Sequence, residues 1–281
     1  MRTIAHISDL HFGTERPEVA AGLRGELAAA PPSLLVISGD LTQRARGGQF
    51  RAAQAFLATL PGPQLVVPGN HDVPLFDVTR RFLAPLTRYR KFISDELNPV
   101  YEDGEIFVAG INTARSFTWK AGRISVEQIA AVESRLKTTR ARFKVVVTHH
   151  PFIPPPIMEA RFEHIDLVGR AARAMTVLDA EKVDLLLAGH LHRGYSGDTR
   201  TQYPAAHRGI ISAQAGTAIS HRVRGAEPNG YNRITLDGDR ITVEVRIWRE
   251  REFVAGRRTE YERTAKGWQQ AAGEVRRQKN E

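Results

Sequence analysis

Cysteine is absent from the 281 residues of this chain. Disulfide bonds and thiolate metal sites are therefore excluded. The chain also lacks an apolar run of the roughly 20 residues that a membrane-spanning helix needs, so no membrane partner is expected. Residues 1–8 show no succession of charged, apolar and small residues typical of a secretory signal. The simplest expectation is a cytoplasmic protein.

What the chain does contain is typical of a globular protein, since 42% of its residues are hydrophobic and 25% are charged. Its length suits one catalytic domain with small additions. A net charge of +9 favours nucleic acid as a partner, because a basic surface attracts phosphate backbones. However, the basic residues are spread along the chain, and no stretch interleaves them with aromatic side chains. Nucleic acid therefore stays an alternative partner that we do not favour.

Apolar runs of strand length alternate with segments of helical spacing, which indicates an α/β fold. The expected strands are 3–7, 34–37, 65–67, 106–111, 144–147 and 185–188, and the expected helices are 18–30, 49–60, 126–136 and 171–181. The largely apolar character of 34–37 and 183–188 is typical of strands that are covered on both faces. We therefore expect both of these strands to be buried between other layers.

The pattern becomes rich in strands after Gly209. They are expected at 210–213, 232–236 and 241–247, and Asp237, Gly238 and Asp239 join the last two strands as a hairpin turn. This pattern indicates a second sheet packed beside the first. Residues 257–281 are charged and polar, and are expected to form a tail that is a surface helix or partly disordered. The predicted catalytic domain is therefore 1–256.

Side chains that can bind metals occur in five short clusters, each directly after one of the predicted strands. The clusters are D-L-H at 9–11, S-G-D at 38–40, G-N-H-D at 69–72, T-H-H-P at 148–151 and G-H-L-H at 189–192. Ligands of open α/β sheets bind beyond the carboxyl ends of the strands, so we expect the clusters to meet in one active site. Two segments that begin at this site, 73–101 and 152–168, are expected to form its rim or a lid.

The first two clusters show how these residues would hold metal ions. Two residues apart on an extended segment, Asp9 and His11 point the same way and can bind one ion, while Leu10 points into the core. Asp40 ends its strand where a bridging oxygen is needed to hold two cations, about 3.5–4 Å apart in two-metal hydrolytic sites. Carboxylate oxygen and imidazole nitrogen suit Mn, Fe or Zn. The number of such residues exceeds what a single structural zinc would use.

Together these motifs resemble those of the calcineurin-like metallophosphoesterase superfamily, and most closely its bacterial branch of class III cyclic-nucleotide phosphodiesterases. The resemblance implies an α/β fold of four layers, an αββα sandwich with two mixed β-sheets and a dinuclear metal site at the strand carboxyl ends. It also implies the ligands, which are Asp9, His11 and His192 for one metal, Asn70, His149 and His190 for the other, and Asp40 between both. The metals expected are Mn or Fe, with Zn, Co or Ni as alternatives.

The resemblance gives the last two residues of the G-N-H-D cluster a catalytic role. His71 would donate a hydrogen bond to the phosphate and protonate the leaving oxygen, with Asp72 orienting its ring. The nucleophile would be a water molecule acidified by the metals, without a covalent enzyme intermediate. Asn112 and Arg115, which follow strand 106–111, are candidates for binding the substrate phosphate, and Tyr195 is a candidate for lining the pocket. Structural roles for these three are the alternative.

The resemblance to this branch rests on the sequence G-D-L-T-Q-R at 39–44 and on G-N-H-D. Many phosphoprotein phosphatases and diphosphatases of the superfamily carry G-D-x-x-D-R, and the second aspartate is absent here. The prediction is a phosphodiesterase for a small diester such as a 3′,5′-cyclic nucleotide. The alternatives are a nuclease for DNA or RNA, a phosphomonoesterase, and a non-catalytic scaffold, which the complete set of ligands disfavours. A homodimer is also left open.

Overall fold

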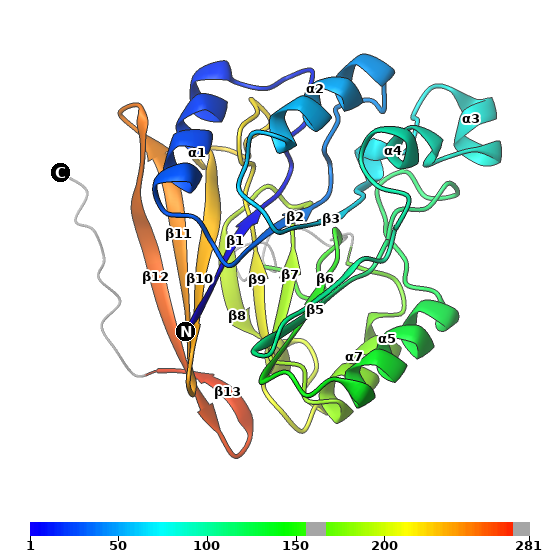
Figure 1. The fold of residues 1–281 in the computed structure, drawn as a ribbon. Helices are drawn as coiled ribbons and strands as arrows, with labels where there is room; N and C mark the ends of the chain where they lie inside the picture. Colours follow the sequence, from blue (N-terminus) through cyan, green and yellow to red (C-terminus); the bar gives the residue numbers. More distant parts are fainter. Residues whose placement is uncertain (156–166, 272–281) are drawn as a thin grey trace.

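The computed structural model of the protein describes residues 1–155 and 167–271. Two β-sheets pack face to face at its centre, and helices cover the outer face of each sheet (Figure 1). These layers confirm the predicted αββα sandwich, and both sheets are mixed. No helix in the described part of the chain is long and apolar enough to cross a membrane.

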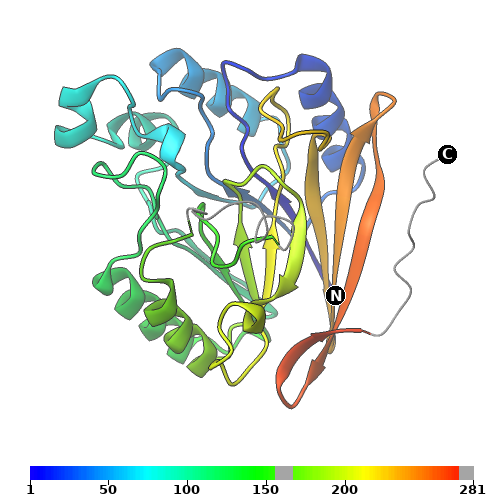
Figure 2. The same ribbon diagram turned by 180° about the vertical axis from the view of Figure 1, so that it is seen from behind.

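The first sheet has seven strands in the order β13, β12, β11, β10, β1, β2, β3. Its parallel part is β1 (Arg2–Ile7), β2 (Leu34–Ser38) and β3 (Gln64–Val67), and its antiparallel part is β10 (Gly230–Asp237), β11 (Arg240–Arg249), β12 (Glu252–Thr264) and β13 (Gly267–Gln270). The helices α1 (Pro17–Ala29) and α2 (Gly47–Leu57) pack on the outer face of the parallel part. Beyond α1, β11 and β12 form one side of the molecule (Figure 2).

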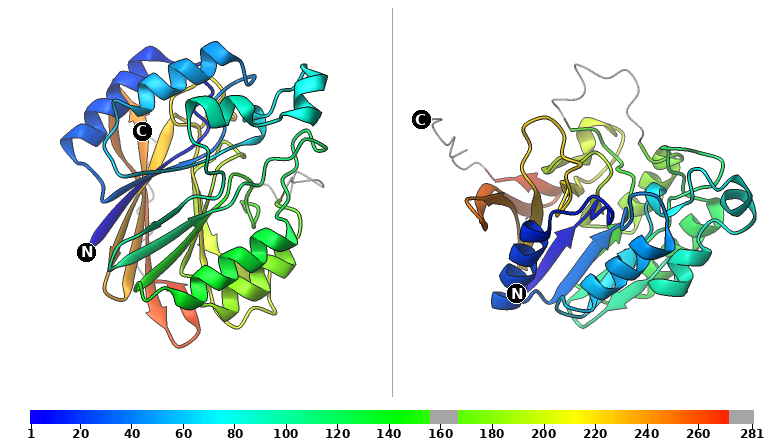
Figure 3. Two further views of the ribbon diagram at one scale, coloured as in Figure 1. Left: turned by 45° about the vertical axis from the view of Figure 1, so that its right-hand side comes forward. Right: turned by 90° about the horizontal axis from the view of Figure 1, so that it is seen from above.

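The second sheet has six strands in the order β4, β5, β6, β7, β9, β8. The parallel strands are β5 (Ile106–Gly110), β6 (Phe143–Val147), β7 (Leu185–Ala188) and β9 (Ile211–Gln214), and the antiparallel edge strands are β4 (Val100–Glu102) and β8 (Tyr195–Asp198). The helices α5 (Val126–Thr138) and α7 (Ala171–Ala180) lie side by side on its outer face (Figure 3). The carboxyl ends of the parallel strands therefore meet at one edge of the sheet.

Apolar side chains fill all three spaces between the four layers. Leu34 and Val36 of β2 face the second sheet, and Leu35 and Ile37 face α1 and α2. All four are fully buried. A strand covered on both faces carries apolar side chains at every position, which explains the unbroken apolar run at 34–37 and confirms its predicted burial.

The strands after Gly209 do not form a sheet of their own, contrary to the sequence expectation. Only β9 joins the second sheet, most of which comes from the middle of the chain. β10 pairs antiparallel with β1, with Arg2 opposite Leu236, and thereby extends the first sheet. The predicted hairpin turn is present, because Asp237 pairs with Arg240 at the start of β11. Pairing between distant strands leaves no local signal, so the sequence could not assign these strands to a sheet.

The predicted charged tail is also partly wrong. Residues 257–270 form the second half of β12 and all of β13, and the structure does not describe 272–281. Tyr261 and Trp268 anchor these strands, since each is only 1% exposed. Charged side chains next to the anchors, such as Arg258 and Glu262, are exposed. The charge of this outer face hides the alternating pattern of the strand.

The predicted rim segment 73–101 contains two short helices beside the site. They are α3 (Val78–Leu83) and α4 (Thr87–Phe92), which follow the 3-10 helix η1 (Asn70–Asp72). Arg81 of α3 is 2% exposed and donates hydrogen bonds to the carbonyl oxygens of Pro74, Ser116 and Thr118. These bonds tie α3 to the loop that follows β5. Of the second rim segment, 152–168, residues 156–166 lie outside the described residues.

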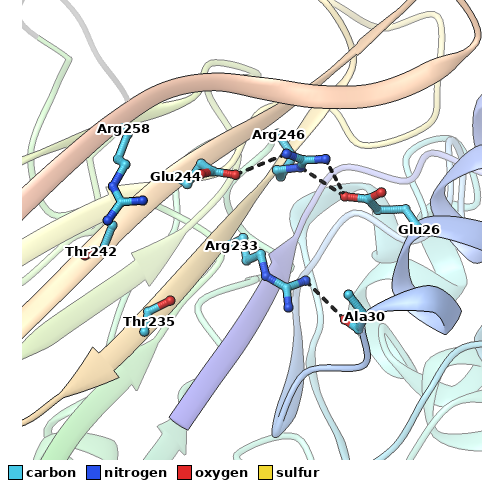
Figure 4. Close-up of a pocket in the computed structure, with 8 residues that line it drawn as sticks. All are labelled: Glu26, Ala30, Arg233, Thr235, Thr242, Glu244, Arg246 and Arg258. Carbon is cyan, nitrogen blue, oxygen red and sulfur yellow. Dashed lines mark hydrogen bonds and ion pairs between the residues drawn. The ribbon is translucent and has the colours of Figure 1, made fainter. Parts of the chain in front are cut away.

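A pocket of about 490 Å³ lies on the outer face of the first sheet, next to α1 (Figure 4). Its charged side chains are paired with protein groups: Arg246 lies 2.8 Å from Glu26 and 3.2 Å from Glu244, and Arg233 donates to the Ala30 carbonyl over 3.1 Å. None of its lining residues belongs to the predicted metal-ligand set. This pocket is therefore an uncovered polar face of the sheet, and its charged side chains are paired with other groups of the protein.

Candidate metal centre

The five predicted clusters come together between the two sheets. They follow β1, β2 and β3 of the first sheet and β6 and β7 of the second. Two hydrogen bonds cross between the sheets here. His149 Nδ1 donates to the Ser38 carbonyl over 2.7 Å, and the His190 N–H donates to Asp9 Oδ2 over 3.0 Å. The carboxyl ends of both sets of parallel strands therefore build one buried site.

Three of the predicted ligands, Asp9, His11 and His192, form what we call the first half-site. Asp9 Oδ1 lies 3.5 Å from His11 Nε2 and 3.5 Å from His192 Nε2. Asp9 Oδ1 and both ring nitrogens of His11 are buried and have no hydrogen-bond partner in the described part of the protein. Leaving a buried polar group unpaired costs about 1–3 kcal/mol. Lone pairs that converge in this way suit a bound cation.

Asn70, His149 and His190 form the second half-site. Asn70 Oδ1 lies 3.0 Å from His149 Nε2 and 3.1 Å from His190 Nδ1. Asp40 stands between the two half-sites, because its Oδ2 lies 3.6 Å from His11 Nε2 and its Oδ1 lies 3.4 Å from His149 Nε2. The structure thus brings all seven predicted ligands together, with one carboxylate oxygen of Asp40 turned to each side. The donor set fits two cations.

Backbone carbonyls orient three of the predicted ligands. His149 Nδ1 donates to the Ser38 carbonyl over 2.7 Å, and His192 Nδ1 donates to the Arg222 carbonyl over 2.5 Å. Each bond directs the other ring nitrogen, Nε2, towards the carboxylates, as in histidines that bind metals. Asn70 Nδ2 donates to the Trp119 carbonyl over 3.5 Å, which turns Asn70 Oδ1 towards the histidines.

Burial and the neighbouring charges shift several pKa values in the site. Burial lowers the pKa of His11 to about 4 and that of His190 to about 3, so both rings are neutral near pH 7 and can act as ligands. Burial would lower the pKa of His149, but the charge of Asp40 outweighs burial and raises it to about 9. Burial would likewise raise the pKa of Asp40, but the surrounding histidines, His149 first, hold it well below its usual range.

Five of the seven predicted ligands have left-handed backbone conformations. The φ angles are +54° at Asp9, +46° at His11, +52° at Asp40, +71° at His190 and +58° at His192. This conformation costs a non-glycine residue about 1–3 kcal/mol. The expectation that Asp9 and His11 lie on an extended segment is therefore wrong, although their side chains do converge.

The same local arrangement occurs in the first and last clusters. Leu10 between Asp9 and His11 is fully buried, and Leu191 between His190 and His192 is 6% exposed. In both clusters the central leucine packs into the protein while the backbone turns at each neighbour. This turn, rather than strand alternation, directs the flanking side chains into the site.

A glycine permits the close approach of the loops after β2 and β3. Gly39 has a φ of +90°, and a Cβ at this position would lie 2.8 Å from the Gly69 amide nitrogen and 2.7 Å from His149 Nδ1. Any side chain here would displace a loop that carries a predicted ligand. The glycine of the S-G-D motif is thus a packing requirement of the site.

His71 lies beside the first half-site, with its ring centroid 4.9 Å from that of His11. Its Nδ1 donates to the Gln43 carbonyl over 2.9 Å. Two arginines flank the ring: Arg222 Nη1 lies 3.1 Å from His71 Nε2, and Arg44 Nη1 lies 3.5 Å from His71 Nδ1. The ring is therefore fixed through Nδ1, and its Nε2 lies next to a positive charge.

Asp72 does not orient this ring, contrary to the prediction. Its carboxylate accepts hydrogen bonds from the amides of Gly69, Leu41 and Thr42 and from the Thr42 hydroxyl. Burial and then the nearby charge of Asp40 raise the pKa of Asp72 to about 7. Asp72 fastens the loop after β2 to the loop after β3, and the Gln43 carbonyl orients His71 instead.

The three candidates for substrate binding have other contacts in the structure. Asn112 Oδ1 accepts from the Ala114 amide over 3.0 Å, and Arg115 donates to the Asn112 carbonyl over 3.0 Å and to Gln128. Tyr195 lies in β8, where the Arg257 guanidinium is 5.9 Å from its ring centroid. These contacts give Asn112 and Arg115 a structural role in the loop after β5. Substrate binding by the three residues stays a prediction.

Sequence reasoning missed Arg222. Its side chain reaches His71 and the Gln43 side chain, and its carbonyl holds His192. One signal could have found it: Arg222 lies in the loop after the strand expected at 210–213, and loops after parallel strands are where the five clusters were found. No motif marks it, since the contact depends on how this long loop folds back over the site.

Several known proteins have similar sequences. A protein from Arcobacter nitrofigilis named probable glycerophosphodiester phosphodiesterase GpdQ is 28% identical over 168 residues, covering 58% of this chain and 57% of that protein. A probable cyclic nucleotide phosphodiesterase from Synechococcus sp. is 24% identical over 202 residues, covering 69% of this chain and 74% of that protein. The match to the first relative thus spans little more than half of its length.

Among solved structures, the purple acid phosphatase PPD1 from yellow lupin (Lupinus luteus) seeds is similar with a TM-score of 0.65. The two share 14% sequence identity, and the match covers 90% of this chain and 52% of that chain. At this identity the likeness shows the fold alone. Residues 2–194, about two thirds of the chain, match calcineurin-like phosphoesterases, and this range contains all seven predicted ligands. The chain therefore belongs to the calcineurin-like phosphoesterase family.

Proposed function

We propose that this protein is a metal-dependent phosphodiesterase that hydrolyses a small diester, such as a 3′,5′-cyclic nucleotide. The observation that carries the proposal is the position of Asp40, whose two carboxylate oxygens face one half-site each, 3.6 Å from His11 and 3.4 Å from His149. A second line of support is that two relatives are named for the hydrolysis of small diesters, a glycerophosphodiester and a cyclic nucleotide.

The seven predicted ligands suit two transition-metal ions, Mn or Fe first and Zn, Co or Ni as alternatives. Such ions would polarise the phosphoryl oxygens and lower the pKa of a water molecule towards neutrality. Only Asp9 and Asp40 among the seven bring a negative charge, whereas Asn70 offers a neutral carbonyl oxygen. A ligand set of low negative charge leaves a positive site that attracts an anionic diester.

His71 is the proposed proton donor. Because Nδ1 donates to the Gln43 carbonyl over 2.9 Å, Nε2 is the ring atom that can carry a second proton to the departing oxygen. The Arg222 guanidinium, 3.1 Å from Nε2, is the proposed partner of the phosphoryl oxygens. A substrate anion bound there would accept the hydrogen bond that Arg222 now donates to the His71 ring. His71 and Arg222 would thus act on the same phosphoryl group.

The test is hydrolysis by the protein after reconstitution with Mn, Fe, Co, Zn or Ni. Bis(p-nitrophenyl) phosphate, p-nitrophenyl phosphate, a 3′,5′-cyclic nucleotide, a glycerophosphodiester, DNA and RNA are compared at matched concentration, with the chelated protein as control. We expect the aryl diester to be cleaved faster than the aryl monoester, and at least one small natural diester to be hydrolysed.

Each alternative function predicts a different result in this panel. A clear preference for the monoester would indicate a phosphomonoesterase. Salt-sensitive cleavage of DNA or RNA without turnover of small diesters would indicate a nuclease. A protein that binds two metals but hydrolyses none of these substrates would be a scaffold.

A further inference from the structure

Large apolar side chains are exposed mainly in one part of the described protein. Nine such side chains are exposed, and six of them lie on two segments, around α3 and in the loop after β5. The six, which we call the apolar rim, are Phe76 (74% exposed), Val78 (62%), Phe82 (47%), Leu83 (81%), Phe117 (87%) and Trp119 (63%). Contiguous exposed apolar patches are uncommon on soluble monomers and usually mark an interaction surface.

The two segments of the apolar rim are held together by specific contacts. The rings of Phe82 and Phe117 pack with their centroids 5.3 Å apart. Arg81 lies beneath them and donates to the Ser116 carbonyl over 2.7 Å, and its guanidinium lies 5.3 Å from the Trp119 ring centroid. α3 stands on the side of the molecule opposite β12 (Figure 1). The apolar rim is thus one built surface.

The apolar rim borders the candidate metal centre on two sides. On the side of the second half-site, the Trp119 carbonyl accepts from Asn70 Nδ2 over 3.5 Å, and the Lys120 carbonyl accepts from His150 Nε2 over 2.7 Å. On the side of His71, the Phe76 ring lies 5.7 Å from the Arg44 guanidinium, which itself contacts His71. A surface bound to the rim would therefore lie next to the site.

The charges of the two segments are mostly positive. Residues 73–92 contain five arginines and lysines and one acidic residue, Asp77, and residues 115–123 contain three basic residues and no acidic one. The exposed basic residues are Arg90, Lys91, Lys120 and Arg123. Arg80, Arg88 and Arg115 are half-buried, Arg80 pairs with Asp77 over 3.1 Å, and Arg81 is buried beneath the rim. The partner of this surface should therefore be both apolar and negatively charged.

We propose that the apolar rim docks the protein on an anionic lipid surface, with the metal centre next to the membrane. Exposed aromatic and leucine side chains insert into the boundary of headgroups and acyl chains, and neighbouring lysines and arginines are attracted to anionic lipids. Weak peripheral binding that combines two such signals needs no spanning helix. The proposal is independent of which diester the site hydrolyses.

Three other partners fit the apolar rim less well. A second copy of the chain would bring the same cations face to face, and like charges repel. Single-stranded nucleic acid stacks on free aromatic faces, whereas Val78 and Leu83 are aliphatic and Phe82 packs on Phe117. A small ligand is normally buried in a pocket, whereas Leu83 and Phe117 are more than four fifths exposed.

This proposal departs from the expectation of no membrane partner. That expectation rests on the absence of a long apolar run, which tests only for a spanning segment. The apolar rim is assembled from two short segments about 35 residues apart in the sequence. A surface of this kind leaves no trace in a search for hydrophobic stretches.

The native chain carries a reporter for the test. Trp119 is 63% exposed, whereas Trp268 is 1% exposed and Trp248 is packed against the core. Tryptophan emission is recorded with phosphatidylcholine vesicles, with and without phosphatidylglycerol, and quenching by brominated acyl chains is measured. We expect a blue shift and quenching only with the anionic vesicles, weakened by added salt. The substitution Trp119→Phe should abolish the signal.

Two pairs of substitutions then separate the apolar and the charged contributions. Leu83→Ser with Phe117→Ser removes apolar surface, and Lys120→Glu with Arg123→Glu reverses two exposed charges. Each pair should weaken vesicle binding about ten-fold or more. The control is Arg24→Glu with Arg140→Glu, two exposed arginines outside both segments, which makes the same change in net charge. Thermal unfolding and metal content check that each variant is folded, and the exposed charge pair serves as the test if the apolar pair misfolds.

Several outcomes would overturn the proposal. One is the absence of binding to anionic vesicles, and another is equal binding by the variants of the apolar rim and the wild-type protein. Conversion of a dimer to a monomer by Leu83→Ser with Phe117→Ser, without vesicle binding, would assign the rim to a second copy of the chain. Salt-sensitive binding of an oligothymidylate lost in the same variants, again without vesicle binding, would assign it to nucleic acid.

Discussion

The two half-sites differ in charge and in burial. The first includes the carboxylate of Asp9, with Asp9 and His11 fully buried and His192 5% exposed. The second has no carboxylate of its own, and Asn70 and His190 are half-buried. A carboxylate in a dry site attracts a cation more strongly than a neutral amide does. The first half-site is therefore expected to hold its metal more tightly.

The half-sites also differ in whether their polar atoms have hydrogen-bond partners within the protein. Asn70 Oδ1 meets both histidines of the second half-site at 3.0 Å and 3.1 Å. In the first half-site, both His11 ring nitrogens are buried without a hydrogen-bond partner in the described structure. A metal bound in the second half-site would replace existing hydrogen bonds. A metal bound in the first would give a partner to buried polar atoms that have none in the described structure. This difference again makes the first half-site the stronger one.

The substitution Asp40→Ala should damage both half-sites, because it removes the residue that they share. We expect loss of both metals and a fall in kcat/KM for the aryl diester of about 10³-fold or more, since metal catalysis supplies several kcal/mol. Elemental analysis after reconstitution and diester turnover measure the two effects. Asp95→Ala, at an exposed carboxylate, is the matched control. Normal metal content and rate in Asp40→Ala would disprove the bridge.

The substitution His71→Ala tests whether chemistry is separate from metal binding. We expect both metals to stay and kcat to fall by about 10²- to 10⁴-fold. The loss should be smaller for a nitrophenolate leaving group, which hardly needs a proton, than for an alkoxide. His207→Ala, at an exposed histidine, is the control. An equal loss for both leaving groups would reject the role of proton donor.

Exchanging the charged and the neutral oxygen ligand tests directly which half-site binds its metal more tightly. Asp9→Asn should weaken the tighter metal site by about ten-fold or more, because ligand charge sets cation affinity. Asn70→Asp should strengthen the weaker site, yet reduce diester turnover by roughly ten-fold, because a further negative charge repels the substrate. Metal titration with a competing chelator gives both affinities. If Asp9→Asn affected only the weaker site, the assignment of the half-sites would be reversed.

The smallest effect is expected outside the ligands, at Thr217. Its hydroxyl lies 2.7 Å from His192 Nδ1 and donates to the Arg222 carbonyl over 2.7 Å. Thr217→Val should weaken metal binding about ten-fold at the first half-site only, as is usual for residues that orient a ligand. Thr176→Val, on the exposed face of α7, is the control. A change confined to the second half-site would contradict this prediction.

The sequence predicts those parts of the fold that have a local signal. The run 34–37 is recognisable because β2 is buried on both faces, so every position is apolar. The second half of β12 is not recognisable, because its inner face depends on residues such as Tyr261 while its outer face is charged. The pairing of β1 with β10 joins residues more than 200 positions apart, and no local pattern encodes it.

The candidate site follows the same rule. The seven predicted ligands can be recognised in the sequence because side chains that can bind metals stand directly after the strands. The left-handed turns at Asp9 and His11 are not predictable, because this conformation is uncommon for any non-glycine residue and no local sequence signal marks it here. The role of Arg222 depends on the path of a long loop. The sequence therefore identifies which side chains come together in the site, but not the backbone conformation that brings them together.

The central position of β1 has a consequence for synthesis of the protein on the ribosome. β1 lies between β2 and β10, and β10 begins only at residue 230 of 281. The first half-site joins Asp9, near the start of the chain, to His192, which the late residue Arg222 holds in place. Contacts this distant form only after the intervening chain has emerged. A polypeptide released before Gly230 would contain all seven predicted ligands and Arg222 but lack the strand that pairs with β1, so we expect it to bind metal poorly.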